Sequence, residues 1–539
     1  MSAPLEKLLR DARIDLILAR IEKDESVIND VITHLDSDIR SIKFNSIHVL
    51  GEVGEKSTDA VSKITSCLED DDWSICREAA RSLGKIGTLA KDAVPRLSIL
   101  LKDKEESIRK EAATALGKIG NPTIQSITSL RDALDDNSDI VRTEAAIALG
   151  EIGPDAFEAI PKLMESLKDV SWTVRTSSAQ SISQIGKGST RAIPALIYAL
   201  EDPDWRVRYR VVNTLADIGE PAVPSILEVL THKNHIVRKE AIEALGEIKI
   251  TDPKIIGKIA SLLGDKAENV RGKAADALRS IGEEAVPTLS KEVETTENRF
   301  NYPYRISKIS EIVLILSLIP YVLGLVFMFH PLFSSFIMWQ PILIILGLII
   351  FGIGKYNETK RITHLRVIII SALGGIGVKA QDAILTLLNQ LKVGEQEERF
   401  EPLFKNKIRR KLKTFYDDPL AMKASIRIES ARSLGKIGVN SEPAINGLEL
   451  ALNDPREKVR REAALSLGKL GESAKIAIPS LLRALKDENP DVRWRASEAL
   501  GKIGVNTEDV ITNLNGLVHD ECDYVCESAI NAIDSLTEE

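Results

Sequence analysis

The stretch IRKEAATALGKIG, residues 108–120, decides the fold, because the chain repeats it. Similar segments, VRTEAAIALGEIG and VRREAALSLGKLG, occupy residues 141–153 and 459–471. In each segment, alanine and leucine recur at the spacing of one helix face. A glycine pair closes each segment, and we expect it to end the helix, because glycine adopts left-handed backbone conformations at little cost. Internal similarity of this kind is typical of repeat architectures.

An arginine marks the register of the repeat, and most successive arginines are 33 residues apart. The column comprises Arg40, Arg77, Arg109, Arg142, Arg175, Arg208, Arg238, Arg271, Arg366, Arg427, Arg460 and Arg493. The steps from 271 to 366 and from 366 to 427 are much longer, so they must contain insertions. A final divergent copy places Cys526 in the arginine position.

Each repeat predicts a helical hairpin. An aspartate six residues before the arginine should cap the first helix, as at Asp103, Asp136, Asp169, Asp202, Asp265, Asp454 and Asp487. A proline after the glycine pair should open the second helix, where its missing N–H costs nothing, as at Pro95, Pro161, Pro194, Pro224, Pro287 and Pro479. One hairpin cannot bury its apolar face alone, so we expect neighbouring hairpins to stack into a right-handed α-solenoid.

The pattern D-x-x-x-x-V-R-x-x-A-x-x-x-L-G-x-I-G, followed by A-V/I-P-x-L, resembles the HEAT-like repeats named after the phycobilin lyases. The resemblance covers residues 1–297 and 361–539 and implies an all-α solenoid of about 12–13 hairpins. Such repeats occur in bilin lyases, in metal-dependent hydroxylases and in scaffolds without chemistry, so they imply a fold more than a function. The deoxyhypusine hydroxylases of this type bind iron through His-Glu dipeptides. None of the 7 histidines here precedes a glutamate, which disfavours that activity.

Two uncharged runs interrupt the repeats, at residues 312–329 and 332–354. At a rise of about 1.5 Å per residue, the first run is just long enough to cross a bilayer core and the second has length to spare. We therefore expect a two-helix transmembrane hairpin within residues 298–360. A re-entrant hairpin is an alternative, because the connecting HPLFSS is mostly apolar, and a hairpin buried in a soluble array is another.

Basic residues flank these runs on both outer sides, and none lies between them: Arg299, Arg305 and Lys308 come before, and Lys355, Lys360, Arg361 and Arg366 come after. The positive-inside rule therefore predicts a multi-pass membrane protein with both termini and both repeat arrays in the cytoplasm. The 4 cysteines would then be in a reducing compartment. The predicted organisation is an N-terminal array at 1–297, the membrane hairpin at 298–360 and a C-terminal array at 361–539.

A charged insertion occupies residues 394–423 of the C-terminal array and turns from acidic to basic. Its basic residues are Lys405, Lys407, Arg409, Arg410, Lys411 and Lys413. One interpretation is a solvated segment whose two halves neutralise each other. The other is a patch that contacts anionic lipid headgroups. The net charge of −8 gives no general case for nucleic-acid binding.

The remaining candidates for chemistry are few. His519, Cys522 and Cys526 share one helical face, but a metal needs more ligands, so ordinary packing is the favoured interpretation. Phosphate-binding glycine loops, zinc-ligand spacings and nucleophile elbows are absent from the sequence, so no cofactor is predicted.

Two further features recur with the repeat. We expect the arginine column to form an internal Asp–Arg ladder rather than a phosphate site, with Arg109, Arg142, Arg175, Arg208, Arg460 and Arg493 as its clearest members. Tryptophans recur beside the column and could form a binding strip, although scattered exposed aromatics are also ordinary. They are Trp73, Trp172, Trp205 and Trp494.

These features favour a membrane-anchored scaffold or adaptor that binds protein partners on the cytoplasmic face. One alternative is an enzyme or chaperone resembling the bilin lyases, which would act on a tetrapyrrole-carrying protein. A second is a regulator of a membrane complex that acts through the hairpin.

Glu6, Asp11 and Asp15 interrupt the first 20 residues, which therefore predict a helix rather than a signal peptide.

Overall fold

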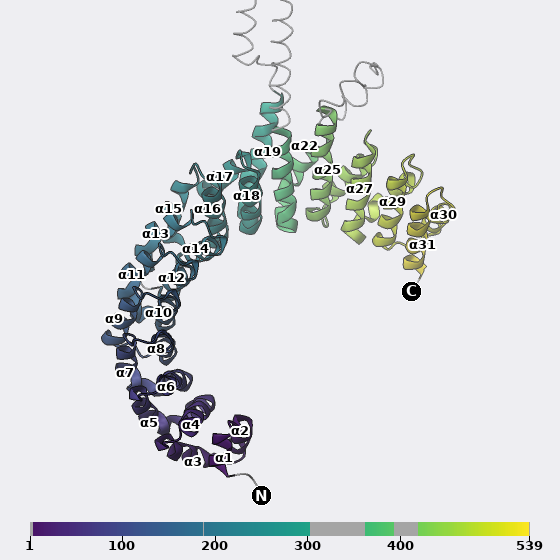
Figure 1. The fold of residues 1–539 in the computed structure, drawn as a ribbon. Helices are drawn as coiled ribbons and strands as arrows, with labels where there is room; N and C mark the ends of the chain where they lie inside the picture. The colour runs from purple at the N-terminus through teal and green to yellow at the C-terminus, as the bar shows by residue number, and fades with distance from the viewer. Residues whose placement is uncertain (1–3, 187, 302–361, 393–418, 538–539) are drawn as a thin grey trace, which may run out of the picture. The chain divides into compact units, whose positions relative to one another are not determined.

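The computed structural model describes residues 4–186, 188–301, 362–392 and 419–537, and these residues form helices and connecting turns without a strand (Figure 1). The predicted membrane runs at 312–329 and 332–354, and the basic residues between 405 and 413, lie outside the described residues. Chain contacts divide the protein into two compact units, Met1–Ile248 and Lys249–Glu539. This division lies inside the predicted N-terminal array, and the predicted boundaries at 297 and 360 stay predictions.

Unit 1 alternates long and short helices, and the long helices pack side by side in chain order (Figure 1). The long helices are α4 (Arg40–Val53), α6 (Trp73–Ile86), α8 (Glu106–Ile119), α10 (Asp139–Ile152), α12 (Trp172–Ile185), α14 (Trp205–Ile218) and α16 (His235–Ile248). The short helices are α3 (Val27–Thr33), α5 (Val61–Ser66), α7 (Val94–Leu100), α9 (Ile124–Ala133), α11 (Ile160–Ser166), α13 (Ile193–Ala199) and α15 (Val223–Val229). The single helix predicted at the N-terminus is instead two, α1 (Leu5–Arg10) and α2 (Ile14–Lys23), because the chain turns at Ala12 with φ 53°.

Unit 2 repeats the same alternation. Its helices are α17 (Pro253–Ser261), α18 (Glu268–Ile281), α19 (Val286–Asn301), the helical residues 362–376, α22 (Ile384–Leu391), α25 (Pro419–Ile437), α26 (Glu442–Ala451), α27 (Glu457–Leu470), α28 (Ile478–Ala484), α29 (Pro490–Ile503), α30 (Glu508–Asn515) and α31 (Asp523–Thr537). The long helices α25, α27, α29 and α31 pack successively against one another.

The two glycines of the repeat have different roles. Gly120 caps α8 with φ 61°, as predicted. Gly117, predicted to help end the helix, lies inside α8 instead. A Cβ on Gly117 would lie 2.8 Å from the Cα of Ala148 in α10. This first glycine therefore lets neighbouring long helices approach closely, since any side chain would push them apart.

At the start of the long helices, the repeat aspartate and the N-cap are different residues, although the sequence pattern assigns both roles to the aspartate. The Asp103 carboxylate accepts a hydrogen bond from the Glu105 backbone N–H at 2.8 Å, but the N-cap of α8 is Glu105 itself. The predicted N-cap assignment of the repeat aspartate is therefore wrong by two positions, because the carboxylate caps the turn that precedes the helix. The prolines lie in the first turn of the short helices as predicted, for example Pro95 in α7 and Pro161 in α11.

In the part of the chain that the structure describes, one helical segment, Ile362–Leu391, is long and apolar enough to cross a membrane by length and composition. It packs as a repeat hairpin, because Gly377 breaks it with φ 71° and Ile370, Leu373 and Leu387 are buried in unit 2. Arg366 is buried in the same segment and donates to Gln390.

Candidate functional site

The arginine column forms a ladder between repeats in the structure. Arg109 Nε lies 2.7 Å from Asp136 Oδ2, and Arg109 Nη1 donates to the Asp103 carbonyl at 3.0 Å. Each such guanidinium thus joins the entry turn of its own repeat to the aspartate of the next. The same ion pair recurs at Arg142–Asp169, Arg175–Asp202, Arg427–Asp454, Arg460–Asp487 and Arg493–Asp520.

The ladder carboxylates are strongly engaged by these contacts. A hydrogen bond from Arg493 lowers the pKa of Asp520. Burial alone would raise the pKa of Asp136, but hydrogen bonds from Arg109 and from the Ser138 backbone outweigh it, so this pKa is also lowered. The partners are oriented toward each other and little exposed, so the ladder joins repeats rather than offering an anion site.

We call each side chain that occupies the ladder position of a long helix a rung. The first two rungs differ from those predicted by the spacing of arginines in the sequence. Lys43, not Arg40, occupies the ladder position in α4, with its Nζ 2.5 Å from Asp70 in the next repeat. Cys76, not Arg77, occupies it in α6, where the thiol donates to the Leu68 carbonyl at 3.1 Å. Burial raises the pKa of Cys76 to about 11.

The rung at Arg208 differs because His232 stands where the next aspartate is expected. Arg208 Nη1 still donates to the carbonyl of Asp202 at 2.7 Å. Its Nε instead pairs with Glu240 of α16 at 3.2 Å. This rung therefore joins two long helices directly.

A second set of contacts joins the middles of neighbouring long helices in unit 1. His48 Nδ1 lies 2.7 Å from Glu78, Arg81 Nη2 lies 2.8 Å from Glu111, and Thr114 Oγ1 lies 3.0 Å from Glu144. The acceptor is the sixth residue of its helix each time. We call Glu78, Glu111, Glu144 and Glu240, which share this helix position, the carboxylate column. In α14 the same position is Arg210.

Exposed aromatic and apolar side chains recur on α12, α13, α14 and the turn before α12, and we call them the aromatic patch. We define it as Val170, Trp172, Tyr198, Trp205 and Tyr209, all of which are exposed. Trp172 and Trp205 are the first residues of α12 and α14, so they occupy equivalent positions in successive repeats. Trp205 and Tyr209 leave 65% and 53% of their surface in solvent. These five residues are the candidate interaction surface of unit 1.

Charged neighbours hold part of the patch in place. The guanidinium of Arg206 lies 3.6 Å from the ring centroid of Trp172. Asp204 fixes the same guanidinium through an ion pair at 2.7 Å and accepts the Arg206 backbone N–H as the N-cap of α14. This cation–π contact orders the Trp172 ring before any partner arrives.

The other predicted tryptophans do not continue the patch. Trp73 begins α6, but Glu106 and Asp139 occupy its position in the two following long helices. Trp494 is the fifth residue of α29, in unit 2, where its ring meets that of Tyr524 edge-on at 5.6 Å. The tryptophan strip predicted from the sequence therefore did not include Val170, Tyr198 and Tyr209, which belong to the aromatic patch. Their joint position on two adjacent repeats was the signal that could have shown the patch.

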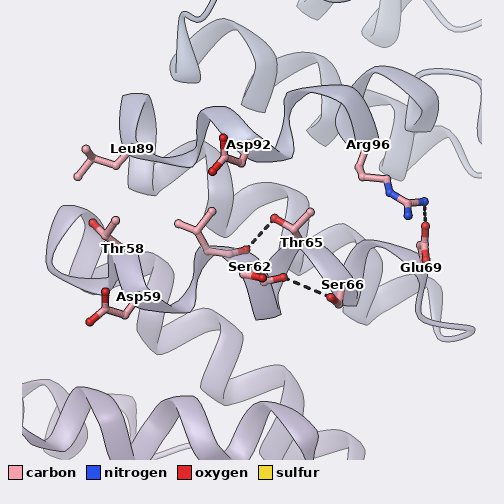
Figure 2. A pocket seen from close by; sticks show the side chains of 10 residues that line it. Thr58, Asp59, Ser62, Thr65, Ser66, Glu69, Leu89, Asp92 and Arg96 are labelled. Carbon is pink, nitrogen blue, oxygen red and sulfur yellow. Dashed lines mark hydrogen bonds and ion pairs between the residues drawn. The ribbon is translucent and has the colours of Figure 1, made fainter.

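An open hollow of about 420 Å³ lies between α5 and α7. Figure 2 shows Arg96 paired with Glu69 at one end and Leu89 at the other. The lining hydroxyls already donate within their own helix: Thr65 to the Val61 carbonyl at 2.7 Å and Ser66 to the Ser62 carbonyl at 3.3 Å. The hollow therefore presents few free donors, and we assign it no function.

The weak metal candidates are occupied by backbone contacts. Cys526 Sγ donates to the Asp520 carbonyl at 3.2 Å, as the ladder arginines do in their own repeats. The Cys522 backbone N–H donates to the Asp520 carboxylate at 3.0 Å. Among the described residues, no group of three or more His, Cys, Asp and Glu side chains is placed to hold a metal ion, and that includes the helix face with His519.

Comparison with known proteins identifies the repeat. The family model of HEAT repeats matches residues 28–114, 61–150, 127–197, 160–235, 223–300 and 445–534, so the chain belongs to the HEAT-repeat family. No curated protein matches the chain.

Similar solved structures share low sequence identity with this chain. Importin beta is 13% identical over 97% of this chain and 80% of its own, with a TM-score of 0.37. Kap121p is 13% identical over 99% and 70%, with a TM-score of 0.36. The CpcE and CpcF complex of phycocyanin lyase from Nostoc sp. PCC7120 is 22% identical over 46% and 94%, with a TM-score of 0.29.

Proposed function

We propose that this chain is a HEAT-repeat adaptor that binds protein partners through the aromatic patch of unit 1 and is attached to a membrane by residues 312–354. The observation that carries the first part is the concentration of exposed aromatic rings at Trp172, Tyr198, Trp205 and Tyr209, in a chain with only 4% aromatic residues. HEAT arrays expose long, continuous surfaces of stacked helices, which suit partner binding.

The composition of the patch supports a protein partner. Tryptophan, tyrosine and arginine are the residues that most often dominate protein–protein binding energy. Trp205 and Tyr209 lie one turn apart in α14. Trp172 begins the preceding long helix, α12, and the guanidinium of Arg206 stacks on its ring. Rings that are already ordered lose little side-chain entropy when a partner covers them.

The membrane attachment is supported by the sequence. The runs at 312–329 and 332–354 carry no charge, and basic residues flank both of their outer sides. Arg366, one of the basic residues counted after the second run, is buried in unit 2 and so does not face the membrane surface. Lys355, Lys360 and Arg361 still follow the second run.

A quantitative cross-linking pull-down tests the patch. Full-length protein in native membranes should lose a defined set of partners when Trp205 and Tyr209 are both changed to alanine. Ile124→Ala is the matched control, because Ile124 is 86% exposed but lies outside the patch, in α9. Equal recovery of every partner from both variants would show that the patch is not the binding surface.

Cysteine labelling tests the attachment. Single cysteines at Ser2 and Glu539 should be labelled from the cytoplasmic side, and one at Ser334 should be labelled from the opposite side only. Labelling of Ser334 from the cytoplasm would indicate the re-entrant form. Extraction of the full chain by carbonate would contradict membrane insertion altogether.

A further inference from the structure

The carboxylate column is interrupted by Ser177 in α12 and by a positive charge, Arg210, in α14. Glu144 occupies the column position in α10 and Glu240 occupies it in α16, whereas α14 places a guanidinium there. Among the described residues, no hydrogen bond or ion pair reaches this side chain. Its Nε is also shielded from solvent without an acceptor. A half-buried arginine without a counter-ion has lost hydration without gaining a compensating contact.

The surrounding acids are engaged elsewhere. Asp204 holds Arg206, and Glu240 is shared by Arg208 and Lys239. Asp217, two turns further along α14, accepts the hydroxyl of Ser183. Each of these carboxylates therefore already has a partner that is not Arg210.

The neighbouring helix α12 contributes no acid at all, since its sequence WTVRTSSAQSISQI contains neither Asp nor Glu. Two of its hydroxyls, Thr176 Oγ1 and Ser178 Oγ, are also buried without a hydrogen-bond partner. Three buried polar atoms without a hydrogen-bond partner thus lie on α12 and α14, the adjacent helices that also carry Trp172, Trp205 and Tyr209.

We propose that Arg210 receives the carboxylate of an Asp or Glu side chain from the bound protein segment, while an apolar residue of that segment packs on Trp205 and Tyr209. This inference rests on the proposed function and names the chemistry of the partner. An arginine binds a carboxylate through two parallel hydrogen bonds, which would satisfy the Nε that the chain leaves unpaired.

The flanking charges favour a single acid over a polyanion. Glu144 and Glu240 stand at the equivalent positions of the helices on either side of the α12–α14 pair. Glu240 is buried and paired with Arg208 and Lys239, so the repulsion of an extended run of negative charge would come from the Glu144 carboxylate on the α10 side. One acidic residue beside an aromatic or aliphatic residue fits both the lone guanidinium and the exposed rings.

A peptide selection tests the proposal. A random 12-residue phage library would be selected on the purified full chain in detergent micelles. Enriched peptides should carry Asp or Glu beside an apolar residue, and Arg210→Gln should weaken their binding by roughly tenfold or more. Arg210→Glu should reject them and accept the same peptides with the acid changed to lysine.

The outcomes separate the two claims. Peptides that need Trp205 but contain no acid, or that bind Arg210→Gln equally well, would overturn the role of Arg210 and leave the patch as the binding site. Phosphopeptides or polyanions that bind more tightly than single acids would also overturn it. If no enriched peptide depends on Trp205, the proposed function fails, and this inference fails with it.

A stability measurement provides an independent check. Arg175→Gln breaks the ion pair with Asp202 and should lower the thermal unfolding midpoint. Arg210→Gln breaks no such pair and removes an uncompensated charge, so it should leave the midpoint unchanged or raise it. A similar loss in both variants would mean that Arg210 has a structural role inside the chain, which would overturn the proposal.

Discussion

Replacing Gly117 by alanine tests the close contact on which the stacking of long helices depends. The new methyl carbon would lie 2.8 Å from the Cα of Ala148 and 3.0 Å from its Cβ. Ordinary contact begins near 3.4 Å, so α8 and α10 would have to separate by about 0.6 Å. The Glu151 carboxylate, which the methyl group would also approach, can rotate away, but the Cα of Ala148 cannot, so side-chain rotation does not relieve the clash.

Two opposing effects set the magnitude. Overpacking of this kind costs about 1–3 kcal/mol. Alanine inside a helix is more favourable than glycine by about 1 kcal/mol. We therefore expect Gly117→Ala to lower the free energy of unfolding by about 1 kcal/mol. Gly272→Ala in α18 should raise it by about 0.5–1 kcal/mol, because a Cβ there meets nothing within 4 Å.

Hydrogen exchange followed by mass spectrometry gives a local measurement in the full-length protein. Peptides from α8 and α10 should exchange faster in the Gly117 variant, and peptides from α18 should exchange more slowly in the Gly272 variant. If α8 and α10 exchange no faster than in the unmodified protein, close helix approach is not what Gly117 provides, and the reasoning is refuted.

Three further perturbations test the ladder. Arg427→Gln should lower the free energy of unfolding in urea by about 3–5 kcal/mol, because it leaves the Asp454 carboxylate, 3% exposed, without its main partner; a loss below about 1 kcal/mol would contradict this. The hydrogen bond from Arg493 lowers the pKa of Asp520 below its ordinary 3.8, so its stabilisation is complete above about pH 4 and is lost as the pH falls through the lowered value. Asp520→Asn should thus weaken the pH dependence of acid unfolding, and an unchanged acid-unfolding curve would count against the pairing. Cys76, whose pKa burial raises to about 11, should react with iodoacetamide near pH 8 far more slowly than the two cysteines of the last repeat, and equal rates by mass spectrometry would show that the α6 rung opens in solution.

The fold could be predicted from the sequence because the residues that define the repeat cannot easily be replaced by others. The glycines at 51, 84 and 117 keep a strict 33-residue spacing, since backbone contact tolerates no side chain there. The charged residues of the ladder predict the repeat register less well. Lys43 takes the place of an arginine in α4, and Cys76 occupies the ladder position in α6 without forming an ion pair. Counting arginines therefore misplaced the first two rungs.

The candidate site was less predictable for a different reason. Trp172 and Trp205 stand out in the sequence, but Tyr198 comes from a short helix and Val170 from the turn before α12. Only the stacking of consecutive repeats shows which of these side chains lie near one another. The missing partner of Arg210 is likewise visible only once the neighbouring helices are in place, because sequence spacing alone does not show which acids are already engaged.

The ladder also determines how each unit should respond to a pulling force. Every rung joins one repeat to its successor and reaches no further, so a mechanical load is carried rung by rung. Stretching should release repeats one at a time, each adding about 110 Å of extended chain for its 33 residues. In unit 1 the joint between α6 and α8 has Cys76 in place of a charged rung, so under load it should depend on the ion pair between Arg81 and Glu111.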